Sequence, residues 1–296
     1  MSLDEITSAS LSPRCLSCIL DKFIDASPDD APWRTKADYM RSVLRTVADN
    51  SETMTAPEIG RELETLLERT YGIKRGLGTE KRHFNELVLG MEEHLRQRIR
   101  QSDDPLGFAI RLSMAGNFID FGQTGAVDDG KLIELVGNAE NMELDTDVLA
   151  ELELRMREAR TIAYLTDNCG EIVLDKLVIS EILDINPDAR ITTIVRGKPA
   201  SNDATMEDAV QVGLDTVCTV IDNGDDVAGT VPSRVNDETR AAIRDSDLVI
   251  SKGLANYETL SGRGLNRYFL FLCKCALYSD IFGVPLHTGL IVRGVA

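Results

Sequence analysis

The fold is decided by the stretch Tyr164-Leu165-Thr166-Asp167-Asn168-Cys169-Gly170-Glu171. It begins as an apolar, strand-like run and passes directly into an acidic residue, an amide, a glycine and a helical pattern. A strand that leads straight into a helix is typical of α/β proteins. A carboxylate at the carboxyl end of such a strand, beside a helix N-terminus, lies where open α/β sheets bind ligands. The stretch therefore predicts both the fold class and the position of the functional site.

Further β-rich runs follow at spacings that leave room for a helix between them. The predicted strands cover residues 161–166, 190–195, 216–221, 247–251 and 268–273, and the predicted helices between them cover 171–183, 205–212 and 236–244. Regular alternation of strand and helix is typical of a mainly parallel sheet with crossover helices. The second half of the chain is therefore predicted to be a three-layer α/β/α, Rossmann-like domain.

The first half has a helical pattern. Apolar residues recur three and four apart in segments 35–48, 56–71 and 80–100, and strand signals are scarce. Thr55 precedes a helix start at Ala56-Pro57, and Gly72 marks its end. We therefore expect an all-helical domain over residues 1–150 and an α/β/α domain over residues 151–296, with the change of pattern near a helix at 147–160.

The composition excludes several classes of partner. With 49 acidic and 32 basic residues the net charge is −17, which disfavours nucleic-acid binding because that binding depends on neutralised phosphates. Residues 1–19 lack the pattern of a secretory signal, and no apolar run approaches the ~18 residues of a membrane span. We expect a cytoplasmic protein with no membrane partner. An anionic small-molecule substrate would require concentrated local positive charge, such as a divalent cation with lysines.

Polar side chains follow every predicted strand. The carboxyl ends of parallel strands lie along one edge of the sheet, so these side chains are expected to converge although they are far apart in the sequence. They are Asp167 and Asn168 after the first strand, Lys198, Asn202 and Asp203 after the second, Asp222 and Asn223 after the third, Lys252 and Asn256 after the fourth, and Lys274 after the fifth.

Asp167, Asn168 and Asp203 are the predicted metal ligands. Two carboxylates and an amide oxygen form a hard site suited to Mg²⁺ or Mn²⁺, and Co²⁺ or Ni²⁺ also fit sites with few protein ligands. Each aspartate has an ordinary alternative, Asp167 as a helix N-cap and Asp203 as an acid in a first helical turn. Their expected convergence at one edge favours a metal site over two separate caps.

Two lysines supply positive charge at the same edge. Lys252 lies between an apolar strand and Gly253, which predicts an ammonium directed at a phosphate. Lys274 interrupts an apolar run, so its ammonium must reach solvent, a carboxylate or a ligand. An edge-strand lysine that extends to solvent is the alternative for Lys274.

Several enzyme classes lose support because their motifs are missing. The sequence has no Gly-x-x-x-x-Gly-Lys-Ser/Thr loop, no Gly-x-Gly-x-x-Gly after the first strand and no Gly-x-Ser-x-Gly elbow. P-loop kinases, dinucleotide dehydrogenases and α/β hydrolases are therefore disfavoured. Asp167 has no second aspartate two positions later, which also disfavours an aspartyl-phosphate mechanism.

The cysteines and histidines leave several interpretations open. Cys15-x-x-Cys18 is compatible with a redox pair or with half of a zinc site, but Cys273 and Cys275 complete that site only if the chain ends meet. Buried thiols with a packing role are the simpler alternative. The three histidines are isolated in the sequence, which favours structural or exposed roles; they are His83, His94 and His287.

Five short motifs together resemble the metal-dependent damage-control phosphatases, formerly a domain-of-unknown-function family. The resemblance spans nearly the whole chain in the family's order, and its CxxC and GNFID elements resemble the microbial branch. The motifs are Cys15-x-x-Cys18, Gly116-Asn117-Phe118-Ile119-Asp120, Asp167-Asn168-x-Gly170-Glu171, Asn202-Asp203-Ala204-Thr205 and Lys252-Gly253-x-x-Asn256-x-Glu258-Thr259.

The resemblance implies a helical N-terminal domain on an α/β/α domain and assigns roles to residues. Asp167, Asn168 and Asp203 would hold the metal and, with Lys252, form the catalytic group. The implied substrate contacts are Asn117, Asp120, Asn202, Lys252, Asn256 and Lys274. Without the resemblance, Asn117 and Asp120 would be interpreted as a helix-end cap.

The expected activity is hydrolysis of small phosphomonoesters, namely sugar phosphates or damaged phosphorylated metabolites. The cofactor would be Mn²⁺, Ni²⁺, Co²⁺ or Mg²⁺, with Lys252 and Lys274 stabilising charge on the phosphoryl group. Two rivals stay open. One is a non-catalytic protein that binds a phosphometabolite. The other is an S-adenosylmethionine-dependent methyltransferase, which the missing glycine-rich loop disfavours.

Overall fold

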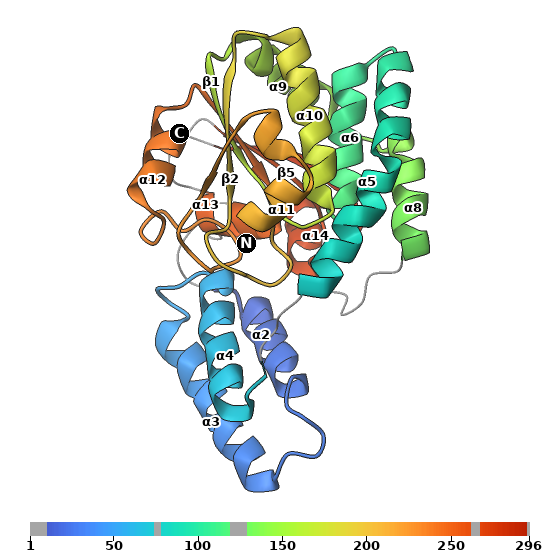
Figure 1. Ribbon diagram of the computed structural model, residues 1–296. Coiled ribbons are helices and arrows are strands. Elements are labelled where there is room, and N and C mark those ends of the chain that lie inside the picture. The colour runs from blue at the N-terminus through green and yellow to red at the C-terminus, as the bar shows by residue number, and fades with distance from the viewer. Residues whose placement is uncertain (1–10, 74–77, 119–128, 262–266, 295–296) are drawn as a thin grey trace.

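The computed structural model describes residues 11–73, 78–118, 129–261 and 267–294 (Figure 1). A larger body surrounds a six-stranded sheet, and a bundle of helices from the start of the chain projects from one end of it. The bundle consists of α2 (Pro13–Asp25), α3 (Trp33–Asn50) and α4 (Ala56–Tyr71). No helix within the described ranges is long and apolar enough to cross a bilayer.

The sheet has the strand order β3-β2-β1-β4-β5-β6. The strands are β1 (Thr161–Leu165), β2 (Arg190–Val195), β3 (Thr219–Asp222), β4 (Leu248–Lys252), β5 (Arg267–Leu272) and β6 (Gly289–Arg293). Pairings among β1 to β5 are all parallel, and β6 pairs antiparallel with β5. The predicted α/β fold with a mainly parallel sheet is confirmed.

Strand β6 is absent from the sequence-based prediction, which stopped at residue 273. The strand is short and follows β5 after the helix α14 (Ala276–Phe282), so it lacks the long crossover that marked the other strands. An antiparallel edge strand on an otherwise parallel sheet needs no such crossover and is common in large sheets. β3 also differs, because it begins at Thr219 after a short 3₁₀ turn over Leu214–Thr216.

The strand order places a topological switch point between β1 and β4. From β1 the chain adds β2 and β3 on one side, and then crosses to add β4 and β5 on the other. The crossovers that leave β1 and β4 therefore diverge, which opens a crevice at the carboxyl ends of these two strands. Asp167 follows β1 and Gly253 follows β4, so both lie at the switch point.

The two faces of the sheet carry different sets of helices (Figure 1). Successive residues of a strand point to opposite faces, and Ile162 and Tyr164 belong to one core cluster while Ala163 and Leu165 belong to the other. The first face is covered by α10 (Glu171–Ile185), α11 (Met206–Gln211) and further helices outside α10. The second face is covered by α12 (Asp237–Asp245), α13 (Leu254–Leu260) and α14.

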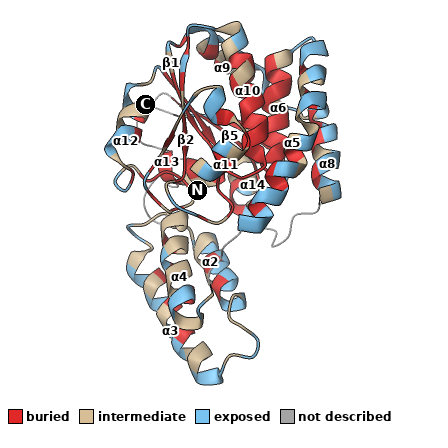
Figure 2. Cartoon of the chain, viewed as in Figure 1, coloured by how far each residue is buried: buried red, intermediate tan, exposed pale blue. Residues whose placement is uncertain are grey.

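Helix α10 lies almost wholly inside the protein. Its sequence is apolar on nearly every side, and it packs between the sheet and outer helices, as its burial in Figure 2 shows. The outer helices come from the part of the chain predicted to form the helical domain. They are α5 (Gly78–Gln101), α6 (Pro105–Gly116), α8 (Asp129–Gly137) and α9 (Thr146–Glu158).

The bundle α2–α4 has a separate core that includes Phe23, Tyr39 and Leu63. Helix α4 starts with a capping box between Thr55 and Glu58 and ends at Gly72 with φ of 71°. The hydrophobic clusters therefore separate the bundle from the rest, while α5 to α9 share the core of the sheet. The division at residue 150 stays a prediction, and it does not coincide with this separation of the cores.

Candidate functional site

Asp167 lies two residues after the end of β1 and is only 7% exposed. Its Oδ2 accepts hydrogen bonds from the side-chain amides of Asn117 and Asn168, each at 2.8 Å. The same two amides also donate to Oε2 of Glu171, at 2.9 Å and 3.0 Å. Asn117 ends helix α6, so the helical half of the chain does reach the carboxylate that follows β1.

The loop after β2 brings Asp203 to the same place. Backbone bonds run from Cys169 N to Asn202 O at 2.8 Å and from Ala204 N to Asp167 O at 2.7 Å, and Asn168 pairs with Asp203 as a β-bridge. The side-chain amide of Asn202 donates to Oδ1 of Asn168 at 2.7 Å. The predicted residues of the first two strand ends therefore gather at one position.

The charges around Asp167 are unbalanced. Burial raises the pKa of its carboxyl well above the ordinary value, and repulsion from Asp203 and Glu171 raises it further. Lys274 and Arg196 oppose this rise without cancelling it. A buried carboxylate close to two others is unfavourable in the protein alone. The set of oxygen donors and the excess of negative charge therefore fit a hard divalent cation.

Arg196 is a buried member of the site that the sequence reasoning missed. It is 1% exposed, and its Nε donates to Oδ2 of Asp203 at 2.6 Å. Its Nη2 donates to Oδ1 of Asn256 at 3.2 Å. The sequence signal for Arg196 is a basic residue immediately after the apolar end of β2. The sequence analysis considered only later residues of this loop, starting at Lys198. Arg196 fixes the orientation of the Asp203 carboxylate.

Asn256 is fully buried on α13, where it ties strand ends together. Its Nδ2 donates to the carbonyl oxygens of Thr166 at 3.1 Å and Lys252 at 2.7 Å. These bonds hold the chain after β1 against the chain after β4. The position predicted to contact substrate thus has both amide atoms bonded to protein groups.

Lys252 is placed differently from the expectation that it points at a phosphate. Its side chain is 0% exposed, and Nζ bonds to Oε1 of Glu171 at 2.6 Å and Oδ1 of Asp175 at 2.8 Å. Burial acts to lower the pKa of Lys252, but the two carboxylates outweigh burial and raise it. The phosphate contact stays a prediction, and in this structure two buried carboxylates on α10 hold the ammonium.

The sequence signal for the buried position of Lys252 is a pair of acidic residues on α10. Glu171 and Asp175 are four residues apart, hence on one face, in the mainly apolar first half of the helix. Buried carboxylates require a cation or hydrogen-bond donors, and Tyr164 also donates to Asp175 at 2.7 Å. Glu171 connects this group to the site, since Oε1 bonds to Lys252 and Oε2 to the amides beside Asp167.

Gly253 allows α13 to approach Asp167. Its φ is 83°, and a Cβ built there would lie 2.1 Å from both Cγ and Oδ2 of Asp167. Any larger residue would collide with the carboxylate in addition to straining the backbone. The close contact with Asp167, a predicted metal ligand, therefore explains why a glycine stands at position 253.

Lys274 lies at the rim of the site and is partly exposed. Its Nζ donates to the carbonyl oxygen of Asn117 at 2.6 Å, while the backbone N–H of Leu272 donates to Oδ1 of Asn117 at 3.2 Å. The ammonium is also close enough to lower the pKa of Asp167. Lys274 is therefore a basic residue beside Asp167 that retains access to solvent. Asp120, predicted to contribute from the same motif as Asn117, lies outside the described residues.

Other polar residues at this edge have structural bonds. Oδ1 of Asn223 accepts from Gly197 N and Asp225 N, both at 2.9 Å, and Asp222 accepts from Gly224 N. These bonds shape the turn after β3. Lys198 lies near Asp226, which pairs with Arg61 of α4 at 2.7 Å. This part of the edge therefore connects the sheet to the bundle.

The segments around Cys15 and Cys275 lie together, as a zinc site would require, but the described residues there do not form one. An ion pair joins Arg14 to Asp280, and the thiol of Cys275 lies close enough to contribute to the raised pKa of Cys15, which burial dominates. All six cysteines are free. Within the described ranges, no three His, Cys, Asp or Glu side chains are grouped so as to hold a metal. A cation at Asp167 must therefore rely on amide, solvent or substrate oxygens as well.

Beside these thiols, burial raises the pKa of Glu258 to about 7, although Tyr278 donates a hydrogen bond that lowers it. The folded carboxyl thus stays neutral to higher pH than an unfolded one, so stability declines as pH rises through 7. We expect Glu258→Gln to gain about 1–2 kcal/mol over the wild type at pH 8 and almost nothing at pH 4. Urea unfolding at both pH values measures this, with exposed Glu86→Gln as the control. An equal gain at both pH values would contradict it.

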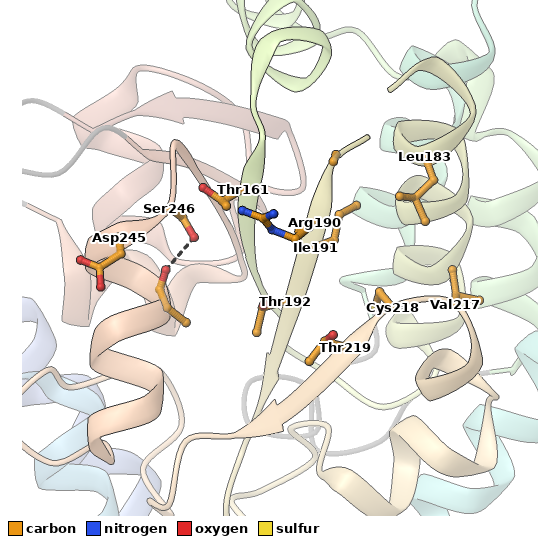
Figure 3. A pocket seen from close by; sticks show the side chains of 12 residues that line it. Thr161, Leu183, Arg190, Ile191, Thr192, Val217, Cys218, Thr219, Asp245 and Ser246 are labelled. Atoms are coloured by element: carbon orange, nitrogen blue, oxygen red, sulfur yellow. Dashed lines mark hydrogen bonds between the residues drawn. The ribbon is translucent and has the colours of Figure 1, made fainter. Parts of the chain in front are cut away.

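A cavity of about 450 Å³ lies at the opposite edge of the sheet (Figure 3). It opens among the amino ends of β1, β2 and β3, where Thr161, Arg190 and Thr219 line it. None of the predicted site residues lines this cavity. Ligands of open α/β sheets bind at the carboxyl ends of strands, so the group around Asp167 is the stronger candidate.

Curated relatives align with nearly the whole chain. A damage-control phosphatase of Pyrococcus horikoshii is 34% identical over 92% of this chain and 93% of its own length. A damage-control phosphatase of Archaeoglobus fulgidus is 30% identical over 93% and 96%. An uncharacterised protein of Methanocaldococcus jannaschii is 28% identical over 97% and 96%.

A solved structure has the same fold. The crystal structure of a DUF89 family protein from Pyrococcus horikoshii superposes with a TM-score of 0.80 at 24% identity, covering 96% of this chain and 99% of that one. The family model described as the damage-control phosphatase ARMT1-like domain matches residues 11–289. This match takes in the bundle, strands β1 to β5 and every described residue of the candidate site. The chain therefore belongs to the family of ARMT1-like damage-control phosphatases.

Proposed function

We propose that the protein is a metal-dependent phosphatase that hydrolyses small phosphomonoesters, such as sugar phosphates or damaged phosphorylated metabolites. The observation that carries the proposal is the buried Asp167 carboxylate, held beside Asp203 and Glu171 at the switch point of the sheet. Relatives named damage-control phosphatases support the same activity. An excess of buried negative charge is costly without a cation, so function accounts for its presence better than packing does.

The carboxylates of Asp167 and Asp203, with the amide oxygen of Asn168, are the proposed ligands of a divalent cation. In the structure the Asn168 amide directs Nδ2 toward Asp167. A half-turn of this amide places the oxygen beside Asp167, which suits a cation there, and the Asn202 amide would have to turn with it because its Nδ2 donates to Oδ1 of Asn168. The bound cation would supply polarisation of the phosphoryl oxygens and acidification of water. Mn²⁺, Co²⁺, Ni²⁺ and Mg²⁺ all accept such oxygen donors.

The remaining residues have distinct proposed tasks. Lys274, partly exposed beside Asp167, binds a phosphoryl oxygen and offsets its charge. Arg196 and Asn117 are positioning residues because they orient the carboxylates of Asp203 and Asp167. Asn202 orients Asn168, and Asn256 braces the strand ends. Lys252 is proposed to act through Glu171 as a positioning residue and not as a phosphate contact.

Hydrolysis of p-nitrophenyl phosphate after chelation and after addition of Mg²⁺, Mn²⁺, Co²⁺ or Ni²⁺ tests the proposal. We expect no turnover in chelator and restored turnover with at least one cation. Equal turnover with and without chelator would contradict metal dependence. Binding of a sugar phosphate without turnover under every cation would favour a non-catalytic binding protein, and binding of S-adenosylmethionine would favour a methyltransferase.

Gly253→Ala is expected to lower the activity at least about 100-fold, because misplacing a catalytic group by an ångström has an effect of this size. The new Cβ would occupy the position of the Asp167 carboxylate. We also expect a loss of stability of about 1–3 kcal/mol from the backbone at φ of 83°. Steady-state kinetics and urea unfolding measure the two effects. Gly90→Ala on α5, where a Cβ meets nothing within 4 Å, is the control. Unchanged kinetics in Gly253→Ala would contradict the placement of Asp167.

A further inference from the structure

A second cavity, of about 750 Å³, lies beside the proposed active site. Its walls come from the end of α6, from α8 and the short turn η1 (Ala139–Asn141), and from the ends of β5 and β6 that face each other. This volume is in the range of pockets that enclose drug-sized organic molecules. It is larger than a phosphate group alone requires.

The cavity shares a wall with the site. Asn117 donates from Nδ2 to Asp167 and accepts at Oδ1 from the backbone of Leu272. Leu272 lines the cavity, as does Phe118, the residue after Asn117. A phosphoester held at Asp167 and Lys274 therefore has the cavity next to it. Asn117 separates the two, because it bonds to Asp167 and is adjacent to the lining residues Phe118 and Leu272.

The other side of Asp167 is closed by packed polar groups. Arg196 is 1% exposed, Asp203 4%, and Asn256 0%. These side chains are packed and hydrogen-bonded to one another, and they occupy the space between Asp167 and the residues of β2 and α13. An organic group attached to the phosphate therefore has no room in that direction, whereas the cavity offers room on the side of Phe118 and Leu272.

The lining of the cavity is mainly apolar, and it includes a few polar residues such as Lys131 and Glu143. Leu135 and Met142 contribute aliphatic surface, and the rings of Phe118 and His287 lie 6.0 Å apart. His287 has φ of 67°, unusual for a residue other than glycine, and its N–H donates to Cys273 O at 2.7 Å. This backbone conformation places the imidazole ring of His287 at the wall of the cavity. Such walls suit an apolar or aromatic group better than a chain of hydroxyls.

We propose that this cavity binds the organic group of the substrate and selects phosphomonoesters whose organic group is apolar and of aryl size or larger over short polyol phosphates. The inference rests on the proposed phosphatase function, because it assigns the phosphate to Asp167 and Lys274. It narrows the candidate substrates toward damaged metabolites with bulky groups and away from sugar phosphates.

Kinetics with two esters test the selectivity. We expect kcat/KM for naphthyl phosphate to exceed that for glycerol phosphate at least about tenfold, mainly through KM, because contacts in an apolar pocket discriminate by this order. Leu135→Trp, which fills the cavity, should remove most of this preference and leave glycerol phosphate unaffected. Ile133→Trp is the matched control, since Ile133 lies on the same helix, is 45% exposed and does not line the cavity. If Leu135→Trp fails to fold, Asn138→Trp, at another lining residue, replaces it.

Equilibrium binding separates this inference from the phosphatase proposal. Naphthylmethyl phosphonate and methyl phosphonate cannot be hydrolysed, and their affinities are measured by calorimetry in the presence of Mn²⁺. At least about tenfold tighter binding of the naphthyl compound, lost in Leu135→Trp, supports the cavity even if no ester is hydrolysed. Equal affinities of the two phosphonates, or equal losses for both in Leu135→Trp, would overturn the inference even if hydrolysis is observed.

Discussion

Replacing Asp167 with asparagine is expected to abolish phosphoester hydrolysis while leaving the metal-free protein at least as stable as the wild type. We expect the loss in kcat to reach about 10³-fold, the scale of a lost electrostatic contact to the transition state. The stability result follows from the raised pKa of Asp167, which burial and then Asp203 and Glu171 cause. At pH 7 the folded state bears the cost of this charge, and the neutral amide removes the cost.

Urea unfolding and kinetics on metal-free and metal-loaded protein measure these two effects. Asp247→Asn is the matched control at the opposite edge of the sheet. The hydrogen bonds from the backbone of Thr161 and Arg160 lower the pKa of Asp247, so this carboxylate stabilises the fold. The control should therefore lose stability and keep activity. A large loss of stability in metal-free Asp167→Asn would instead indicate that Asp167 is a structural cap.

Lys252→Met is expected to destabilise the protein by about 3–5 kcal/mol, the effect of removing one partner from a buried ion pair. The substitution leaves the carboxylates of Glu171 and Asp175 buried without their cation. Through Glu171 the change also reaches the amides of Asn117 and Asn168, so any folded fraction should have reduced kcat. Thermal unfolding and kinetics measure the two effects.

Lys274→Met is the contrasting variant, because Lys274 is partly exposed and lies at the rim. We expect a change in stability of less than about 1 kcal/mol, with a raised KM for phosphoesters. The two lysines were given the same role from the sequence, and these variants separate them. A stable Lys252→Met protein with only a raised KM would return Lys252 to the role of phosphate contact.

The convergence of the polar residues could be predicted because it depends only on the parallel sheet. Strand ends of parallel strands share an edge, so Asp167 and Asp203 had to approach each other once the strands after residue 161 were identified. Strand alternation and turn residues are local signals, and they located β1, β2, β4 and β5 to within one residue at each end. The helices α3, α4, α5 and α9 were likewise evident from their spacing of apolar residues.

The contacts of buried charges could not be predicted in the same way. Whether Lys252 faces a ligand or Glu171 depends on the packing of α10 against α6, which links segments far apart in the sequence. Arg196 was missed for a similar reason, since its partner Asp203 lies on the loop after β2 and its partner Asn256 lies on α13. The edge strand β6 was missed because a short apolar run near a chain end has no distinctive period.

The cation site at Asp167 and Asp203 is the central claim, and calorimetric titration of Mn²⁺ into metal-free protein tests it most directly. We predict that the wild type binds a single Mn²⁺ and that Asp167→Asn and Asp203→Asn each lower the affinity by more than about 100-fold, beyond the effect of losing an outer partner. Unchanged Mn²⁺ affinity in both variants would contradict the claim.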